Sequence, residues 1–145
     1  MRVLIVEDEA LVAMEIEAML AIAGHDAIGP ADDLETALAI LETEVPDLAL
    51  VDIKLARGCS GLDVATVLQA RGVPVIFASG NCDIARGRGL GLGCLHKPIN
   101  DHTLAAAVSF AGALMKGQPL PAKPVSLHLF AEVKSTVKCT NDEAG

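Results

Sequence analysis

The sequence has no tryptophan or tyrosine and only three phenylalanines, so aromatic residues make up 2% of its 145 residues. Any core must therefore be filled by aliphatic side chains, which the 52% hydrophobic content supplies. No apolar run is long enough to cross a bilayer, and the apolar stretch at residues 3–6 is too short for a signal peptide. Length and composition predict one domain with a short extra piece, located in the cytoplasm and not in a membrane.

Basic residues are also scarce. The chain has 11 Lys and Arg against 19 Asp and Glu, which gives a net charge of −8. This balance argues against a general binder of nucleic acids or anionic membranes, because phosphate groups are bound by faces rich in Lys and Arg. It is compatible with binding a cation and with a basic surface on a partner protein.

Cysteines are few, and their spacing matches no known framework. No pair has the two-residue spacing of a zinc or redox site, and a chain of this size does not need a set of disulfides. The sequence therefore predicts free thiols at all four positions: Cys59, Cys82, Cys94 and Cys139.

Short apolar segments alternate with helical ones along most of the chain. Strands are predicted at residues 2–6, 25–28, 47–53, 74–79 and 94–97, and helices at 9–23, 32–45, 62–70 and 100–115. Asp32 and Glu35 have the spacing of a capping box at the start of the second helix. Alternation with near-continuous apolar strands predicts a doubly wound α/β fold, a five-stranded parallel sheet sandwiched by helices.

Polar residues follow the predicted strands at the point where each ends. Glu7 and Asp8 follow the first strand, Asp52 ends the third, Ser79 ends the fourth and Lys97 ends the fifth. In open parallel sheets, ligands bind beyond the carboxyl ends of the strands, so these side chains are expected to converge.

The convergence of carboxylates indicates a divalent cation. Mg²⁺ binds one or two protein carboxylates and often shares a phosphate oxygen, so it would offset their repulsion. One carboxylate could then act as a nucleophile, with Lys97, Ser79 and the cation each holding one phosphoryl oxygen. Together these groups can form an acyl phosphate on an aspartate.

The motifs "VLIVEDE", "LALVDI", "VIFASG" and "LHKPI" occur in this order at the strand ends. This set resembles the receiver domain of bacterial two-component response regulators, over about residues 1–116. The resemblance implies a flavodoxin-like receiver fold and Mg²⁺ as cofactor. By position, it implies that Asp52 is the phosphoacceptor, that Ser79 and Lys97 contact the phosphoryl group, and that Lys97-Pro98 is often a cis bond. The implied magnesium ligands are Asp8, Asp52, the backbone carbonyl of Lys54 and, through water, Glu7.

The chain departs from the family pattern at the switch position. The usual switch aromatic lies three residues before the lysine, where this chain has Cys94. "FASG" and the missing proline after the acceptor resemble a subgroup with FATG in strand four, in which the fourth helix is often mobile. Glycines at 87, 89, 91 and 93 also predict a fourth helix that is short, frayed or absent. Asn81 and Lys54 flank the expected path of the hydrolytic water and are predicted to set the phosphoryl lifetime.

Residues 117–145 are predicted to be a Pro-rich linker and a short C-terminal extension following the receiver domain at 1–116. The pattern at Val125, Leu127 and Leu129 suits a strand, whereas Leu129, Phe130 and Val133 suit a helix, and the choice stays open. This extension is expected to dock on its own receiver or to be exchanged in a homodimer, and the alternative is a disordered tail.

The predicted function is a phosphorylation-dependent signalling switch, and not an enzyme. As a stand-alone receiver, it would take a phosphoryl group from a sensor histidine kinase or a histidine phosphotransfer protein. It would then signal by contact with a downstream protein that the sequence does not name, or act as a phosphate sink. Neither nucleic acid nor a membrane is expected as a partner.

Two alternative functions share some of these features. An aspartate-nucleophile phosphatase of the haloacid-dehalogenase type also uses a strand-end Asp, a Ser or Thr and a Lys. It needs a second Asp two residues after the nucleophile, where this chain has Lys54. A dinucleotide loop at "GLGLG" is more remote, because this segment neither follows the first strand nor opens a clear helix.

Overall fold

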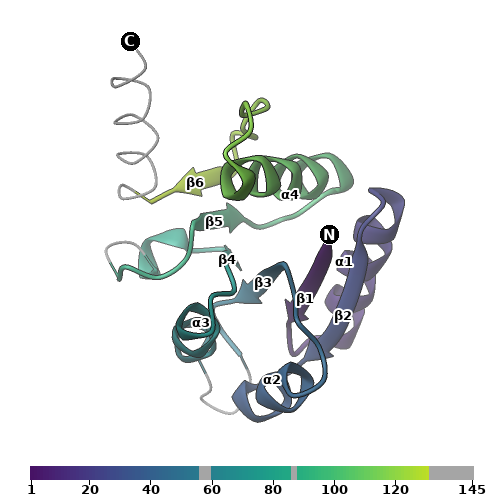
Figure 1. The fold of residues 1–145 in the computed structure, drawn as a ribbon, viewed down its shortest axis with the longest axis vertical. Helices are drawn as coiled ribbons and strands as arrows, with labels where there is room; N and C mark the ends of the chain where they lie inside the picture. The colour runs from purple at the N-terminus through teal and green to yellow at the C-terminus, as the bar shows by residue number, and fades with distance from the viewer. Residues whose placement is uncertain (56–59, 86–87, 131–145) are drawn as a thin grey trace.

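The computed structural model describes residues 1–55, 60–85 and 88–130 (Figure 1). In these residues the chain forms one six-stranded sheet in the order β2-β1-β3-β4-β5-β6, of which the first five strands are parallel and β6 is antiparallel to β5. The strands are β1 Arg2–Val6, β2 Asp26–Ala31, β3 Leu48–Asp52, β4 Val75–Ser79, β5 Gly93–His96 and β6 Leu127–Leu129. The helices are α1 Ala10–Ile22, α2 Leu34–Leu41, α3 Gly61–Ala70, the short 3₁₀ turn η1 Cys82–Ile84 and α4 Asp101–Lys116.

Helices cover both faces of the sheet, because the central strands are apolar on both sides. All five residues of β3 and of β4 are buried. One apolar cluster joins α2 and α3 to one face, and a second joins α1 and α4 to the other. The predicted doubly wound, flavodoxin-like α/β fold is confirmed, with β6 as a sixth strand in a segment for which the sequence left strand and helix open.

The predicted boundaries of β2 and α2 were wrong, and α2 ends at Leu41 and not at residue 45. Strand β2 does not stop at residue 28 but continues to Ala31, through a cis peptide bond between Gly29 and Pro30. Its end is held in the sheet because the Glu7 N–H donates to the Ala31 carbonyl at 2.9 Å. The capping box of α2 is formed by Asp33 and Thr36 and not by Asp32 and Glu35, since the Asp33 carboxylate accepts from Thr36 N at 2.8 Å.

The helix that receiver domains usually have between β4 and β5, their fourth, was predicted to be short, frayed or absent here, and the structure agrees. Between β4 and β5, the described residues contain one helical element, the three-residue turn η1. The glycines that follow have packing roles. A Cβ on Gly91, whose φ is +75°, would lie 3.0 Å from the Val75 carbonyl, and one on Gly93 would lie 2.5 Å from the carbonyl of His128. The glycine-rich segment therefore brings β5 close to both of its neighbours.

The prediction of free thiols was wrong for two of the four cysteines. Cys82 and Cys94 form a disulfide, with Cα atoms 5.7 Å apart. The pair could not be predicted from the sequence, because its members are 12 residues apart and match no motif. Pairing of β4 with β5 brings η1 back beside the middle of β5. Cys59 and Cys139 lie outside the described residues.

The first part of the C-terminal extension docks on its own sheet as a strand. Helix α4 ends at Lys116 and is capped by Gly117, which has φ of +64°, and residues 118–126 lead to β6. Leu127 is buried at 1% exposure in the cluster that contains α1 and α4. The structure thus favours the strand alternative for residues 127–129, while Val133, which suits both patterns, lies outside the described residues. None of the helices in the described part of the chain has the length and apolar character needed to cross a bilayer.

Candidate functional site

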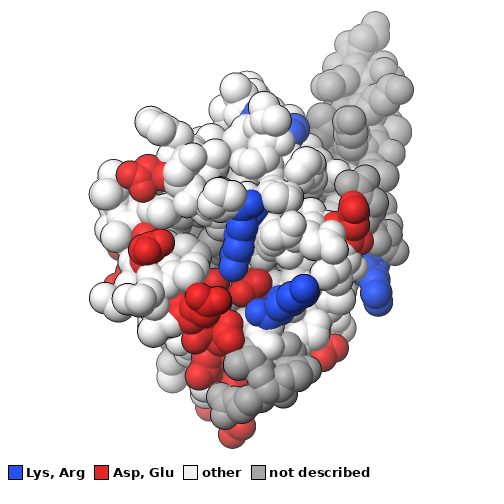
Figure 2. Space-filling view, turned by 180° about the vertical axis from the view of Figure 1, so that it is seen from behind, with Lys and Arg blue, Asp and Glu red and all other residues white. Residues whose placement is uncertain are grey.

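The carboxylates predicted from the sequence come together at one edge of the sheet. Strands β1 and β3 are parallel neighbours with Val6 opposite Val51, so the residues that follow them leave the sheet side by side. One carboxylate oxygen each of Glu7, Asp8 and Asp52 lie within 4.8 Å of one another. Figure 2 shows acidic side chains gathered on this side of the molecule, with basic side chains next to them.

Glu7 is the most buried of the three acids, with 3% of its surface exposed. Burial and, next, the negative charge of Asp52 raise the pKa of Glu7 to about 7. Lys97 and the backbone N–H of Glu9, which donates to Glu7 Oε2 at 3.3 Å, act in the opposite direction but do not restore the ordinary value. The cluster therefore holds more negative charge than its surroundings stabilise, a property that suits a cation site.

Lys97 brings the one positive charge that contacts these acids among the described residues. Its Nζ lies 3.2 Å from Glu7 Oε1 and 3.4 Å from Asp52 Oδ2. Burial lowers the pKa of Lys97, but the charges of Asp52 and Glu7 outweigh burial, so its pKa is raised and the ammonium form is favoured. The peptide bond to Pro98 is cis, as the resemblance implied.

Ser79 ends β4 and is 4% exposed. Its hydroxyl is held by the loop that follows, because Oγ donates to the Asn81 carbonyl at 3.2 Å and accepts from Asn81 N at 3.0 Å. The backbone N–H of Lys97 donates to the Ser79 carbonyl at 2.9 Å. The backbones of Ser79 and Lys97 are therefore joined, while the Ser79 hydroxyl is engaged by Asn81.

Lys54 contributes to the site through its backbone. Its N–H donates to Asp52 Oδ1 at 3.2 Å, and the residue pairs with Ser60 in an isolated antiparallel bridge. The Lys54 side chain is exposed. The hydrogen bond from the Lys54 N–H orients the Asp52 carboxylate.

Sequence reasoning missed Gly61, which has a positioning role. It is the first residue of α3, and its N–H donates to the Ile53 carbonyl at 2.8 Å. A Cβ built on Gly61 would lie 2.0 Å from the Asp52 carbonyl oxygen, which leaves no room for any side chain. The only sequence signal was the position of this glycine directly after Ser60, because serine commonly caps the start of a helix.

A pocket of about 390 Å³ adjoins the site on the side of α1. It lies between this helix and the cis Lys97-Pro98 segment, and the Lys97 side chain forms part of its wall. On the same helix, Leu11 and Met14 are 75% and 63% exposed. The pocket is lined by Val12, Glu15, Ile16, Met19, Lys97, Pro98 and Ile99.

Comparison with known families identifies this arrangement. The response regulator receiver domain model matches residues 3–109 of the chain. The chain belongs to the response-regulator receiver family. It is therefore a receiver domain of the kind used in two-component signalling, in agreement with the fold and with the order of the motifs.

Several characterised receivers are similar to this one in sequence. The chain is 48% identical over 77 residues to the phyllosphere-induced regulator PhyR of Methylorubrum extorquens, which corresponds to 52% of this chain and 29% of that protein. It is 34% identical over 115 residues to the transcriptional regulatory protein PdtaR of Mycobacterium tuberculosis, covering 76% of this chain and 56% of PdtaR. This receiver thus spans only part of the length of either relative.

Solved structures show the same fold. The receiver domain of PhyR from Erythrobacter litoralis matches with a TM-score of 0.71 and 32% identity, over 85% of this chain and 95% of that domain. PhyR from Brucella abortus matches with a TM-score of 0.67 and 36% identity, over 74% of this chain and 45% of that protein. Both similarities are to receivers, which supports phosphorylation-dependent signalling as the general function.

Proposed function

We propose that this receiver accepts a phosphoryl group on Asp52 from a phosphohistidine of a sensor histidine kinase or a histidine phosphotransfer protein. The observation that carries the proposal is the position of Lys97 Nζ, 3.4 Å from Asp52 and 3.2 Å from Glu7. An ammonium group at this distance can form an ion pair with an oxygen of the incoming phosphoryl group. Asp8 and Glu7 complete an acidic wall within 4.8 Å of Asp52.

Mg²⁺ is the proposed cofactor, and the acidic cluster fits it. Three carboxylates share a small volume, and burial together with the charge of Asp52 raises the pKa of Glu7. The groups that would hold the ion are the side chains of Asp8 and Asp52 and the carbonyl of Lys54, with Glu7 acting through water. When bound, Mg²⁺ supplies positive charge that offsets the negative charge of these acids and of a phosphoryl oxygen.

The proposed reaction is a transfer between two side chains. An Asp52 carboxylate oxygen forms a bond to phosphorus, the bond between phosphorus and the donor imidazole nitrogen breaks, and its electron pair returns to the imidazole. Lys97 pairs with one phosphoryl oxygen. The Ser79 hydroxyl donates to another, which requires its hydrogen to leave the Asn81 carbonyl, while Oγ can still accept from the Asn81 N–H. Exchange of these hydrogen bonds couples phosphorylation to the loop after β4.

The proposed output is contact with a downstream protein, or a role as a phosphate sink. Among similar structures, PhyR of Bartonella quintana is described as an anti-anti-sigma factor and is 33% identical, but this chain matches only 50% of that protein. We therefore propose a protein partner without assigning its class. No catalysis beyond transfer to and from Asp52 is proposed.

Incubation with acetyl phosphate and Mg²⁺ tests the proposal. We expect one acid-labile phosphoryl group per chain by intact-protein mass spectrometry, and none in Asp52→Asn. Asp63→Asn is a matched control, because Asp63 lies exposed in the first turn of α3. Turnover of many equivalents of acetyl phosphate without a persistent phosphoprotein would instead support an aspartate-nucleophile phosphatase.

A further inference from the structure

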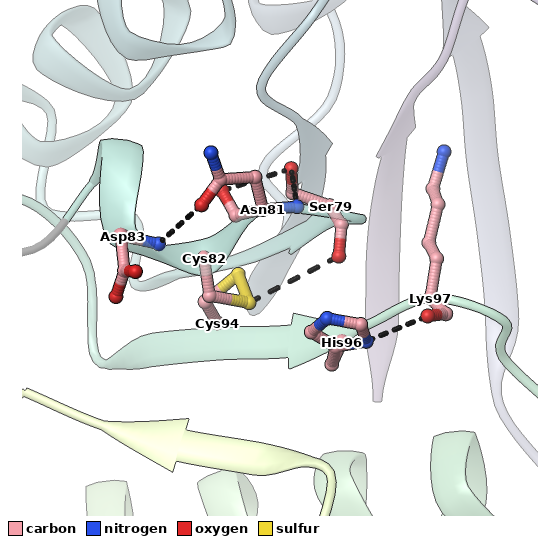
Figure 3. The surroundings of a disulfide bond; sticks show 7 residues. All are labelled: Ser79, Asn81, Cys82, Asp83, Cys94, His96 and Lys97. Carbon is pink, nitrogen blue, oxygen red and sulfur yellow. Dashed lines mark hydrogen bonds between the residues drawn. A yellow bond between two sulfur atoms is a disulfide. The ribbon is translucent and has the colours of Figure 1, made fainter.

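The disulfide joins the two segments that carry the phosphoryl-contacting residues of the proposed site. Cys82 lies three residues after Ser79, and Cys94 lies three residues before Lys97. Figure 3 shows the disulfide on one side of this region, with the Lys97 side chain directed away from it. A covalent bond at this place links the loop after β4 to the middle of β5.

The loop on one side of the disulfide is a single hydrogen-bonded unit. The backbone N–H and carbonyl of Asn81 both hydrogen-bond to the Ser79 hydroxyl. The Asn81 side chain accepts from the N–H of Asp83 at 3.2 Å, which begins η1. The sulfur of Cys82 lies 4.0 Å from the Ser79 carbonyl. A change in the partners of the Ser79 hydroxyl therefore affects the whole turn that contains Cys82.

The other side of the disulfide is a fixed point. Cys94 is fully buried and lies opposite Phe77 of β4 and His128 of β6 in the sheet register. Strands on both sides hold its backbone, so it cannot follow a movement of the loop. With the disulfide closed, the turn at Asn81 and Cys82 is tethered to this strand.

We propose that Cys82 and Cys94 are a site of reversible oxidation, and that the closed disulfide slows phosphorylation by restraining the loop that must release Ser79. This inference rests on the proposed function, because it concerns the role of Ser79 at Asp52. Opening the disulfide frees the loop, so that the Ser79 hydroxyl exchanges Asn81 for a phosphoryl oxygen more readily. The thiol–disulfide state then acts as a second input to the receiver.

The chemistry requires a dithiol reductant of the thioredoxin or dithiothreitol class. A thiolate of the reductant attacks the sulfur of Cys82, which is 7% exposed whereas Cys94 is fully buried. The Cys82–Cys94 bond breaks, and Cys94 leaves with the electron pair and takes up a proton. The second thiol of the reductant then attacks the mixed disulfide and releases Cys82 as a thiol. Two electrons and two protons pass to the pair, and the reductant becomes a disulfide.

The test compares the oxidised and the reduced full-length protein. Peptide mapping without reductant first establishes the Cys82–Cys94 bond in the oxidised sample. The initial rate of phosphorylation by acetyl phosphate and Mg²⁺ is then measured for both forms by intact-protein mass spectrometry. We expect the reduced form to react about fivefold faster or more, at the lower end of typical couplings between sites.

Two variants assign the effect to this pair. Cys82→Ser cannot form the bond and, because Cys82 is 7% exposed whereas Cys94 is fully buried, is the milder of the two single changes. It should react at the rate of the reduced form under both conditions. The matched control is Cys59→Ser/Cys139→Ser, which leaves the pair intact and should keep the full difference between the oxidised and reduced forms.

Each result decides the matter. Equal rates for the oxidised and reduced wild type, or no Cys82–Cys94 bond in the oxidised sample, overturn the inference and leave the proposed function standing. A rate difference that persists in Cys82→Ser also overturns it. If neither form is phosphorylated on Asp52, the proposed function fails and the inference fails with it.

Discussion

At the scale of single residues, the site is defined by a shortage of positive charge. Glu7 is buried beside Asp52, and Lys97 contacts both without restoring the pKa of Glu7 to its ordinary value. Sequence spacing predicted which residues would converge, because residues after neighbouring parallel strands must meet. It could not predict that Glu7 would be the more buried acid, since that depends on how β1 and β3 pack.

The raised pKa of Glu7 predicts how stability and Mg²⁺ binding depend on pH. An acid whose pKa is about 7 when folded, above the value of 4.5 expected when unfolded, binds its proton more tightly in the folded state. This contribution to the stability of the metal-free protein is present below pH 4.5 and is lost as pH rises to about 7. Mg²⁺ must displace the proton, so the increase in Tm caused by Mg²⁺ should grow over the same range.

Circular dichroism at several pH values, with and without Mg²⁺, measures this effect, since the chain has no Trp or Tyr for fluorescence. In Glu7→Gln, the stability of the metal-free protein should no longer fall between pH 4.5 and 7. Glu42→Gln, on the C-cap of α2 away from the site, serves as control and should keep it. A Mg²⁺-induced rise in Tm that is equal at pH 5.5 and pH 7.5 would contradict the prediction.

Lys54→Ala should shorten the lifetime of phosphorylated Asp52. The Lys54 side chain is exposed, while its backbone N–H holds Asp52 Oδ1, so alanine removes the side chain beside the site and keeps the hydrogen bond. Easier access of water should speed hydrolysis about threefold, which is about 0.7 kcal/mol in barrier height. Loss of the phosphoryl group after removal of acetyl phosphate gives the rate, and an unchanged rate refutes the idea.

At the scale of elements, local sequence predicted most helices and strands but not the close approaches between them. Apolar runs gave β1, β3 and β4 because strands buried on both faces leave little ambiguity. The Cys82–Cys94 bond and the contact of Gly61 with Asp52 both depend on where the turns bring the backbone. Such contacts have no period in the sequence, so pattern analysis could not find them.

Gly61→Ala should damage the site through the backbone. The added methyl group would lie 2.0 Å from the Asp52 carbonyl oxygen, so α3 or the end of β3 must shift. We expect a loss of about 1–3 kcal/mol in the free energy of unfolding, as for other overpacked cores, and slower phosphorylation. Gly80→Ala is the matched control for stability, because a Cβ there meets nothing within 4 Å. Urea unfolding and the acetyl phosphate assay measure both effects, and equal behaviour of the two variants would contradict this role.

At the scale of the whole molecule, the chain folds back so that part of its C-terminal extension completes the sheet. Strand β6 covers the edge of β5, which also carries Cys94 and leads to Lys97. The His96 N–H donates to the Ser126 carbonyl at 2.8 Å, and the Lys123 ammonium donates to the Leu127 carbonyl at 2.6 Å. The proposed site and the extension are therefore connected through one strand, so a shift at Lys97 reaches β6 directly.

Gly93→Ala should release β6 without disturbing the rest of the sheet. The three atoms nearest to a Cβ on Gly93 all belong to β6, beginning with the His128 carbonyl oxygen at 2.5 Å, so the strain falls first on this contact. Undocking exposes Leu127, and amide hydrogen exchange should report the change. Protection should fall at His96 and Phe130, whose N–H groups bond to Ser126 and Leu92, and should persist throughout β3. Gly80→Ala is again the control, and unchanged protection at His96 in Gly93→Ala would show that β6 does not depend on this close approach.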